Sequence, residues 1–597
     1  MKAMIIERLA ALREVMKRER LDAFIFPSTD PHHGEYVPDH WKGREFISGF
    51  NGSAGTAVVT MQEAALWTDS RYFLAAEEQL RGTSFVLMKQ GMEGTPSIAE
   101  WLGRKLSAVN GAEVGMDGMV NDASSVEQMK MDLRRQGGIT LRTNFDPLAL
   151  IWKDRPELPS APIVVHPLDY AGESAAHKIG RVREALRERR VYGILVSALD
   201  DIAWLLNLRG ADVHCNPVFV SYLLLTQETA TLFVDRSKLT IQAEVQLERS
   251  GVKVDDYNRV AAALCDYGEY NILMDKGETA YTLYQKAACQ EKVGASPIPA
   301  MKAVKNEAEI AGYRRSMLRD GVAMVQFLRW LKPAVEAGGE TEISIDRKLT
   351  ALRAEQECFR DISFDTIAGY QAHGAIVHYE ATPETDIPLC PEGLLLLDSG
   401  AQYADGTTDI TRTIALGPVT EEQRHVYTLV LKGHIQLSLL KFPKGASGTQ
   451  LDALARKDLW REGMNYMHGT GHGVGSYLNV HEGPHQIRME WKPTPLVAGM
   501  TVTNEPGLYL AGKFGVRIEN TMIIEPYMKT GFGEFLQLQP LTLCPIDKAP
   551  IDVQLLTDEE LQWLNDYHAR VYEELSPLLD EAHRLWLQEA TASLARG

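Results

Sequence analysis

The sequence predicts a multidomain protein of mixed class, with two related α/β domains followed by an α+β domain that carries a helical tail. Three observations support this prediction. The chain has 597 residues, which favours two to four domains over one. Proline-rich segments divide it near residues 160 and 303. The first two parts share a pattern of elements, whereas the third alternates long helical stretches with strand-like runs.

The proline-rich segments define the expected domain boundaries. The first contains Pro156, Pro159, Pro162 and Pro167, a spacing typical of an extended linker. The second contains Pro297 and Pro299, and a helix is expected to start shortly after it, near Lys305. We therefore expect domains at residues 1–160, 161–303 and 304–597, the last including an extension over residues 545–597.

The first two domains have a similar order of elements. Each begins with a helix, continues with an apolar strand (Ala23–Phe26 or Gly193–Val196), and closes with a strand ending in aspartate (residues 65–69 or 231–235). The separations are similar, which favours two copies of one α/β unit. The alternative is a chance similarity between two α/β domains.

The third domain is expected to be α+β. Helical stretches cover residues 307–332, 420–440 and 450–462, and strand-like runs cover residues 394–398 and 516–524. After Pro545 the tail is mostly helical and contains Trp563, Tyr567 and Trp586. These aromatic residues indicate packing or subunit contacts, and tryptophans exposed on such helices would favour a homodimer.

Composition excludes several classes of function. Hydrophobic residues make up 45% and charged residues 24% of the chain, as in soluble globular proteins. The net charge of −18 argues against nucleic-acid or anionic-membrane binding as a main activity. No apolar run approaches the ~20 residues of a membrane span, and no signal peptide is visible. The six cysteines are scattered without a CxxC pair, which predicts reduced, mostly buried thiols in a cytoplasmic protein.

Five residues match, in type and order, a complete ligand set for two divalent metal ions: Asp398, Asp409, His472, Glu505 and Glu519. Four carboxylates with one imidazole suit a manganese-class or mixed divalent site better than a thiolate zinc site. Four buried carboxylates cannot all ionise without compensating charge. Two divalent cations with a bridging hydroxide come close to balancing them, which indicates metal-assisted hydrolysis.

The first two of these residues lie in a predicted hairpin. Residues 394–398 and 409–414 are expected to form its strands, joined through the turn Tyr403-Ala404-Asp405-Gly406. Because Asp398 and Asp409 are eleven positions apart, an even-numbered loop places both side chains on one face. Directly opposite positions would bring their Cβ atoms to roughly 5 Å. The alternative is an Asp-Gly turn with surface acids, but the four leucines before Asp398 indicate a buried strand.

His468 and His472 lie in the glycine-rich run Met467-His468-Gly469-Thr470-Gly471-His472-Gly473. A helix with two histidines on one face, as in HExxH zinc peptidases, is unfavourable, because the glycines oppose it and no glutamate follows His468. A turn that brings backbone close to a ligand is the better interpretation. A phosphate-binding loop would lack its lysine.

Residues 516–520 alternate apolar and charged side chains, so Arg517 and Glu519 are expected on one face of a strand. Beside Glu505 on the preceding strand, Glu519 would complete a second acidic pair. His378 and His481 also have motif-like settings, in Val377-His378-Tyr379 and His481-Glu482-Gly483-Pro484. Five other histidines of the last domain are interpreted as structural: His373, His425, His434, His485 and His583.

Together these motifs resemble the aminopeptidase P family, the Xaa-Pro aminopeptidases of the pita-bread metallopeptidase fold, in its long three-domain form. The resemblance includes residues 376–379, 398, 409, 468–475, 481–484, 504–507 and 517–520. It extends to residues 48–56 and 67–72 in the first domain and 200–207 in the second, which resemble creatinase-like domains.

The resemblance implies a role for each site residue. Asp398 would bind one metal ion, His472 and Glu505 the other, and Asp409 and Glu519 would bridge both. His378, His468 and His481 would line the substrate cleft, and Arg517 would orient the groups beside Glu519. Arg71 is similar to a family residue that reaches towards the bound peptide.

The implied reaction is hydrolysis of an N-terminal Xaa-Pro bond by a bridging hydroxide activated by two metal ions, most simply Mn(II), with Zn or Co as alternatives. Glu505 would accept and return the proton, and His378 and His481 would donate hydrogen bonds to the carbonyl oxygen. One rival is a prolidase restricted to Xaa-Pro dipeptides, which the three-domain length and the tail disfavour. Another is a non-catalytic peptide- or protein-binding module on the same fold, which the complete ligand set disfavours.

Overall fold

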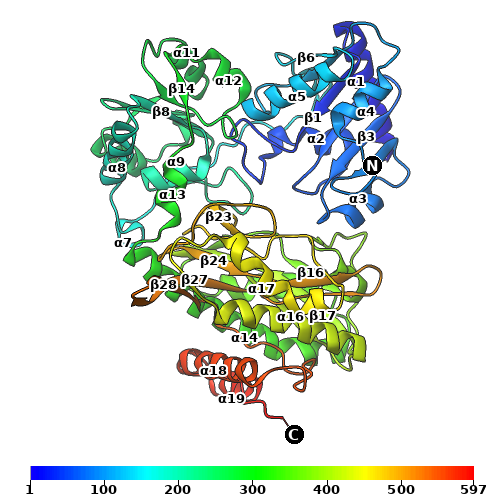
Figure 1. Ribbon diagram of the computed structural model, residues 1–597, viewed down its shortest axis with the longest axis vertical. Helices are drawn as coiled ribbons and strands as arrows, with labels where there is room; N and C mark the ends of the chain where they lie inside the picture. Colours follow the sequence, from blue (N-terminus) through cyan, green and yellow to red (C-terminus); the bar gives the residue numbers. More distant parts are fainter. Residues whose placement is uncertain (1, 597) are drawn as a thin grey trace. The chain divides into compact units, whose positions relative to one another are not determined.

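The computed structural model describes residues 2–596, which form two compact units (Figure 1). Unit 1 comprises the chain up to His166 together with Glu173–Ile298. Unit 2 comprises Pro167–Gly172 and the chain from Pro299 onwards. The predicted proline-rich segments therefore lie close to the points where the chain passes between the units.

Unit 1 contains two six-stranded sheets. The first has the order β4-β3-β2-β1-β5-β6. Its strands are β1 (Ala23–Phe26), β2 (Thr56–Thr60), β3 (Ala64–Thr68), β4 (Phe85–Lys89), β5 (Glu113–Met116) and β6 (Thr140–Arg142). The second has the order β12-β11-β10-β8-β13-β14. Its strands are β8 (Gly193–Val196), β10 (Ser221–Thr226), β11 (Ala230–Val234), β12 (Lys253–Asp255), β13 (Ile272–Leu273) and β14 (Lys292–Val293).

The two sheets have the same pattern of strand directions. In each, the first strand pairs antiparallel on one side and parallel on the other, and both edges end in parallel pairs. The predicted apolar strands are β1 and β8, in equivalent positions. Because an identical order and direction of six strands is specific, the prediction of two related α/β domains is confirmed.

The helices of unit 1 and a short strand pair complete these domains. The first domain holds α1 (Lys2–Glu19), α2 (Gly43–Ser48), α3 (Phe73–Gln79), α4 (Ile98–Lys105), α5 (Ala123–Arg135) and α6 (Leu148–Ile151). The second holds α8 (Ala175–Glu188), α9 (Leu199–Leu206), α10 (Ile241–Arg249), α11 (Val260–Cys265) and α12 (Tyr281–Lys286), with the pair β7 (Val164–Val165) and β9 (Leu208–Arg209). Helix α13 (Ile298–Ala303) leads into unit 2, where α7 (Leu168–Ala171) also lies.

Unit 2 combines long helices with antiparallel sheets. Its helices are α14 (Glu307–Ala337), α15 (Glu342–Ala354), α16 (Glu421–Leu439), α17 (Gly448–Arg461), α18 (Asp558–Leu575) and α19 (Glu581–Ala590). A three-stranded sheet consists of β16 (Ile367–Tyr370), β17 (Leu394–Ser399) and β20 (Ile410–Ala415). A four-stranded sheet consists of β21 (Lys441–Pro443), β28 (Gly533–Pro540), β27 (Asn520–Thr530) and β24 (Thr501–Asn504).

Three smaller strand groups complete unit 2. They are β15 (Phe359–Ile362) with β18 (Ala401–Tyr403) and β19 (Gly406–Thr407), β22 (Gly471–Gly473) with β23 (Glu482–Ile487), and β25 (Gly507–Leu510) with β26 (Phe514–Arg517). Helix α16 packs against α17 and contacts β24 and β28 of the four-stranded sheet (Figure 1). The predicted α+β architecture is confirmed.

The long helices of unit 2 begin where the sequence predicts and have defined caps. Asn306 accepts a hydrogen bond from Glu309 N, and Thr420 accepts one from Gln423 N, each within a capping box. Helix α14 continues past Pro333 to Ala337, five residues beyond the predicted end at residue 332.

The predicted Asp398–Asp409 hairpin is more complex than a single turn. β17 and β20 do pair antiparallel, but the chain between them forms β18 and β19, which pair with β15 in another sheet. Asp398 lies opposite Thr411, so the two aspartates are not directly opposite one another. Asp409 is two residues from Thr411 and therefore still on the same face as Asp398.

The strand expected over residues 516–524 is divided in two. β26 ends at Arg517 and β27 begins at Asn520. At the break, Glu519 N donates to Thr411 O over 3.1 Å and Ile518 N donates to Pro506 O. Glu519 thus lies where the chain changes its pairing partner from β25 to β24.

The tail after Pro545 contains α18 and α19, as predicted, but its tryptophans are not exposed. Trp563 and Trp586 are partly buried against a hydrophobic core that includes Leu564 and Val571. Trp563 stacks on Tyr567 with ring centroids 5.3 Å apart. Because these tryptophans pack against the core of their own chain, they do not support the expected homodimer.

All six cysteines are free thiols. Only Cys215 and Cys544 are buried, so the prediction of mostly buried thiols is wrong. In the part of the chain from residue 2 to residue 596, no helix combines the length and apolar character needed to cross a membrane.

A buried ion pair joins α14 and α15 in unit 2. Arg353 on α15 donates to both carboxylate oxygens of Asp320 on α14, at 2.9 and 3.0 Å, and Tyr403 donates to the same carboxylate. Arg353 is 1% exposed.

The variant Asp320→Ala would leave the guanidinium of Arg353 buried without its ion-pair partner. We therefore expect the free energy of unfolding, measured by chemical denaturation, to fall by about 3–5 kcal/mol. Glu534→Ala, which removes an exposed ion pair with Lys444, is the control and should change stability little. A loss from Asp320→Ala as small as that of the control would contradict this role.

Candidate metal centre

Strand ends and strand junctions bring the five predicted metal ligands together in unit 2. Asp398 is near the end of β17, and Asp409 directly precedes β20. His472 is the middle residue of β22, Glu505 directly follows β24, and Glu519 lies between β26 and β27. Ligand atoms of Asp409, His472 and Glu519 all lie within 4.8 Å of one another. His472 Nε2 is 3.4 Å from Asp409 Oδ2 and 3.5 Å from Glu505 Oε1.

The orientation of His472 is set by its other ring nitrogen. Nδ1 lies 2.8 Å from Gly473 O, and a carbonyl can only accept, so Nδ1 carries the proton of the neutral ring. Nε2 faces Asp409 and Glu505, and in the neutral ring it is the nitrogen that can bind a metal ion. The backbone of His472 is also fixed, because its N–H donates to Thr503 Oγ1 over 3.1 Å.

Two glycines around His472 allow close packing of backbone. A Cβ atom on Gly471 would overlap the carbonyl oxygen of Thr503, and one on Gly473 would collide with Glu482 O and the ring of His485. The prediction of a glycine-rich turn is thus partly wrong, since residues 471–473 form a strand. The glycines let this strand lie against its neighbours, which brings His472 into the site.

The carboxylates are buried, and burial governs their protonation. Burial raises the pKa of Asp398, although Arg517 opposes the shift. It raises the pKa of Glu505 to about 7 and that of Glu519 well above its usual value, where the charge of Asp409 adds to the effect. Burial lowers the pKa of His472, but a hydrogen bond to Asp409 and the charge of Glu505 outweigh it and raise the pKa to about 9. Without added cations, burial and mutual repulsion therefore oppose full ionisation of these carboxyl groups.

Hydrogen bonds from threonines hold two of the carboxylates. Thr411 Oγ1 donates to Glu519 Oε2 over 2.8 Å, and Thr503 Oγ1 donates to Glu505 Oε1 over 3.3 Å. Neither threonine was among the site residues predicted from the sequence. Thr411 could have been found, because the strand period places it on the same face as Asp409.

Arg517 links the acidic group to the segment that carries His378. Its Nη2 donates to Asp398 Oδ2 over 2.6 Å and to Val377 O over 3.4 Å. Its Nη1 donates to Tyr509 OH over 2.6 Å, and this hydroxyl lies 2.8 Å from His468 Nε2. Tyr509, four residues after Glu505, is a further site residue that was not predicted from the sequence.

The predicted cleft histidines occupy different surroundings. The ring of His481 meets that of His472 edge-on, with centroids 4.3 Å apart. His468 contacts Tyr509, and its backbone carbonyl accepts from Arg456 over 2.9 Å. His378 lies between Val377 and Tyr379, and the Tyr379 hydroxyl donates to the buried Glu342 over 2.8 Å. All three histidines are partly exposed, as substrate-binding groups must be.

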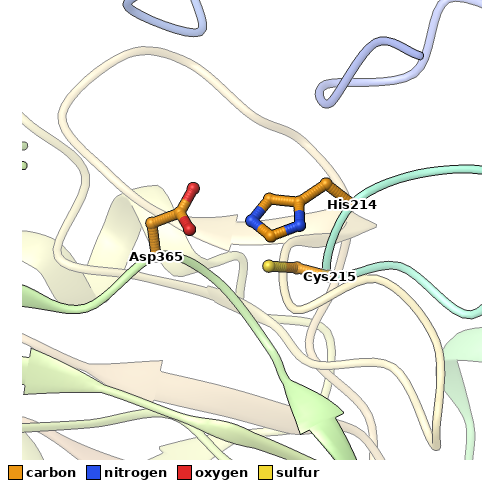
Figure 2. Close-up of side chains that lie close together, drawn as sticks. All are labelled: His214, Cys215 and Asp365. Carbon is orange, nitrogen blue, oxygen red and sulfur yellow. The ribbon is translucent and has the colours of Figure 1, made fainter. Parts of the chain in front are cut away.

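Arg71 belongs to unit 1, where it follows β3 and pairs with Asp69 at 2.8 Å. The role expected for it stays a prediction. Three further residues of types that can bind metals are distant in sequence from the five predicted ligands (Figure 2). His214 and Cys215 follow β9 in unit 1, and Asp365 lies between β15 and β16 in unit 2.

Comparison with known proteins assigns a family to each part of the chain. Residues 311–526 match metallopeptidase family M24, and residues 534–594 match the C-terminal region of peptidase M24. Residues 8–140 and 154–309 each match a creatinase/prolidase N-terminal domain.

Relatives match over nearly the whole chain. Aminopeptidase P2 of Arabidopsis thaliana is 40% identical over 100% of this chain and 89% of its own. A probable Xaa-Pro aminopeptidase P of Aspergillus niger is 40% identical over 99% of both. Among solved structures, an X-prolyl aminopeptidase from Caenorhabditis elegans, described as a cytosolic enzyme with a di-nuclear active site, is 35% identical, with a TM-score of 0.93 over 99% of this chain and 100% of that one. The chain therefore belongs to the aminopeptidase P family of M24 metallopeptidases.

Proposed function

We propose that this protein is a metal-dependent aminopeptidase that releases the N-terminal residue from peptides with proline in second place. The observation that carries the proposal is the convergence of Asp398, Asp409, His472, Glu505 and Glu519 on one buried site. Full-length relatives named for this activity support it.

The residues of the site suit two divalent metal ions. Asp398 Oδ1 is buried and has no hydrogen-bond partner among residues 2–596, which is costly unless a cation binds it. Asp398 would hold one ion, His472 and Glu505 the other, and Asp409 and Glu519 both. Hard oxygen donors with a single imidazole favour manganese, with zinc and cobalt as alternatives.

The protein side chains have distinct parts in the proposed reaction. Two bound divalent ions would lower the pKa of water and polarise the scissile carbonyl. Glu505 would accept a proton from the attacking water and pass it to the proline nitrogen. His378 and His481 would donate hydrogen bonds to the carbonyl oxygen as negative charge develops there.

Proline at the second position explains the need for a dedicated cleft. An Xaa-Pro bond has no N–H at the scissile nitrogen, so the ring itself must be recognised. His468, fixed through Tyr509 and Arg517, and His481 would frame that ring. Arg71 would contact the peptide from unit 1.

We further propose a homodimer located in the cytosol, by similarity to the family. Light scattering should give about twice the chain mass of 66.5 kDa. A single-chain mass at micromolar concentration would count against the dimer, and recovery in a membrane or secreted fraction would count against the location.

The first prediction concerns the residues proposed to bridge the ions. Asp409→Ala and Glu519→Ala should each lower turnover by at least about 10³-fold, since the metal charge contributes several kcal/mol to the transition state. Elemental analysis should show lost metal. Cys358→Ala is the control and should keep both activity and metal. Near-normal turnover with full metal content in either bridging variant would contradict the two-metal site.

The second prediction concerns stability. Metal binds the native state and relieves repulsion among the carboxylates, so removal by a chelator should lower the melting temperature. At metal concentrations about 100 times the Kd the stabilisation is about 2.7 kcal/mol. Differential scanning calorimetry with and without chelator measures this, and an unchanged melting temperature after verified metal loss would argue against the site.

The third prediction concerns specificity. His378→Ala and His481→Ala should each lower kcat by about 10²–10³-fold while metal content stays normal. Replacing the second-residue proline of the substrate by alanine should lower kcat/KM by orders of magnitude. Equal cleavage of Xaa-Ala and Xaa-Pro peptides would indicate a general aminopeptidase, and activity confined to dipeptides would indicate a prolidase.

A further inference from the structure

Arg412 is a buried arginine that holds the backbone behind the acidic site. It follows Thr411 on β20 and is 1% exposed. Because strand side chains alternate, Arg412 projects away from the face that carries Thr411 and Asp409. Its Nη1 donates to Glu519 O over 2.6 Å and to Thr411 O over 3.0 Å. The guanidinium thus fixes the two residues whose side chains meet in the site through the Thr411–Glu519 hydrogen bond.

The C-terminal region supplies most other acceptors of this guanidinium. Nε donates to Pro545 O over 3.0 Å, and Nη2 donates to Cys544 O over 2.8 Å and to Tyr567 OH over 3.0 Å. Nη2 also donates to Asn520 Oδ1, next to Glu519. Every one of these acceptors is neutral, so hydrogen-bond geometry, rather than attraction to a carboxylate, determines where the guanidinium lies.

Tyr567 is the central residue of this arrangement. It lies on α18, which contacts α14 and α16, and its ring stacks on Trp563. Its hydroxyl is within 3.0 Å of Thr542 O and Cys544 O, and it lies 3.3 Å from Asn520 Oδ1. One hydroxyl therefore connects the segment before α18, the Arg412 guanidinium and the residue that follows Glu519.

We propose that Tyr567 is a positioning residue for the metal centre, acting through Arg412 on the backbone of Glu519. The positioning role rests on the proposed function, because it requires Glu519 to be a metal ligand. Ligand oxygens must be placed within about 0.2 Å of their preferred distance, so a small shift of the Glu519 backbone weakens binding. The C-terminal region thereby contributes to metal affinity without contacting the ions.

The test compares two tyrosine-to-phenylalanine variants of the full-length protein. Tyr567→Phe removes the central hydroxyl and keeps the stacked ring. Tyr427→Phe, on α16, removes a buried hydroxyl that donates to Asp547 O over 2.9 Å, in the same C-terminal region but without a hydrogen bond to Arg412. Each variant loses one buried hydroxyl and keeps its ring, but only the hydroxyl of Tyr567 contacts Arg412 and so lies on the path to Glu519.

Mn²⁺ dissociation constants are measured by titration calorimetry on chelator-stripped protein, and melting temperatures of the stripped proteins check folding. Substitution of outer residues around metal ligands typically costs 10–100-fold in affinity. We expect about a tenfold weaker Kd for Tyr567→Phe, an unchanged Kd for Tyr427→Phe, and similar melting of both. Excess Mn²⁺ should restore turnover of Tyr567→Phe, which a loss caused by unfolding would not allow. Arg412→Lys, which keeps the charge but loses the forked geometry, should weaken binding further.

The outcomes separate this role from the proposed function. If the unmodified protein binds no Mn²⁺, the metal centre and the positioning role both fall. If the unmodified protein and Tyr567→Phe bind Mn²⁺ equally well, only the positioning role is overturned. Equal weakening by Tyr567→Phe and Tyr427→Phe would also overturn it, because the effect would then be a general loosening of the C-terminal region.

Discussion

The rest of unit 2 is organised around a concentration of negative charge that is removed from water. Asp398, Asp409 and Glu519 are less than 10% exposed, and Glu505 is close by. Burial raises the pKa of three of these four carboxyl groups. Such a group is compatible with a folded protein only if cations and hydrogen-bond donors surround it. Arg517, Thr411 and Thr503 provide the donors, and the oxygen and imidazole ligands offer a site for cations.

The same constraint explains why the supporting residues are buried and polar. Arg412 holds the backbone at Thr411 and Glu519, and Arg456 holds the carbonyls of Tyr466 and His468. In both cases one guanidinium, which has five N–H donors, binds several backbone carbonyls at the same time. A ligand set spread over five strands and connections cannot be fixed by any one element. Buried arginines that bind backbone carbonyls of two or three segments solve this problem.

The site therefore depends on parts of the chain that contribute no ligand. Helix α17 contributes Arg456, α15 contributes Glu342 beneath the segment that carries His378, and α18 contributes Tyr567. Stability and metal binding are expected to be linked, because the contacts that hold these helices in place also position the ligands.

Unit 1 is organised differently, because it contains two copies of one six-stranded α/β pattern.

The sequence by itself determined the elements and the candidate residues. Local patterns were enough to place β1, β8 and the start of α14, because apolar runs and capping residues act over a few positions. The strand period placed Asp398 and Asp409 on one face before their register was known. The strand period could not show that the chain between them pairs with β15, or that the strand around Glu519 changes its pairing partner. Those pairings depend on segments that are distant in the sequence.

Only the tertiary structure decided which groups support the site. Tyr509 connects Arg517 to His468, although nothing around it in the sequence distinguishes it from any strand tyrosine. Arg412 and its acceptor Cys544 are separated by 132 positions, and hydrogen bonds over such separations leave no local periodicity. The burial of Trp563 and Trp586 was likewise decided by packing on the core. Residue types and their order determine which chemistry is available, whereas long-range packing determines which of those residues meet.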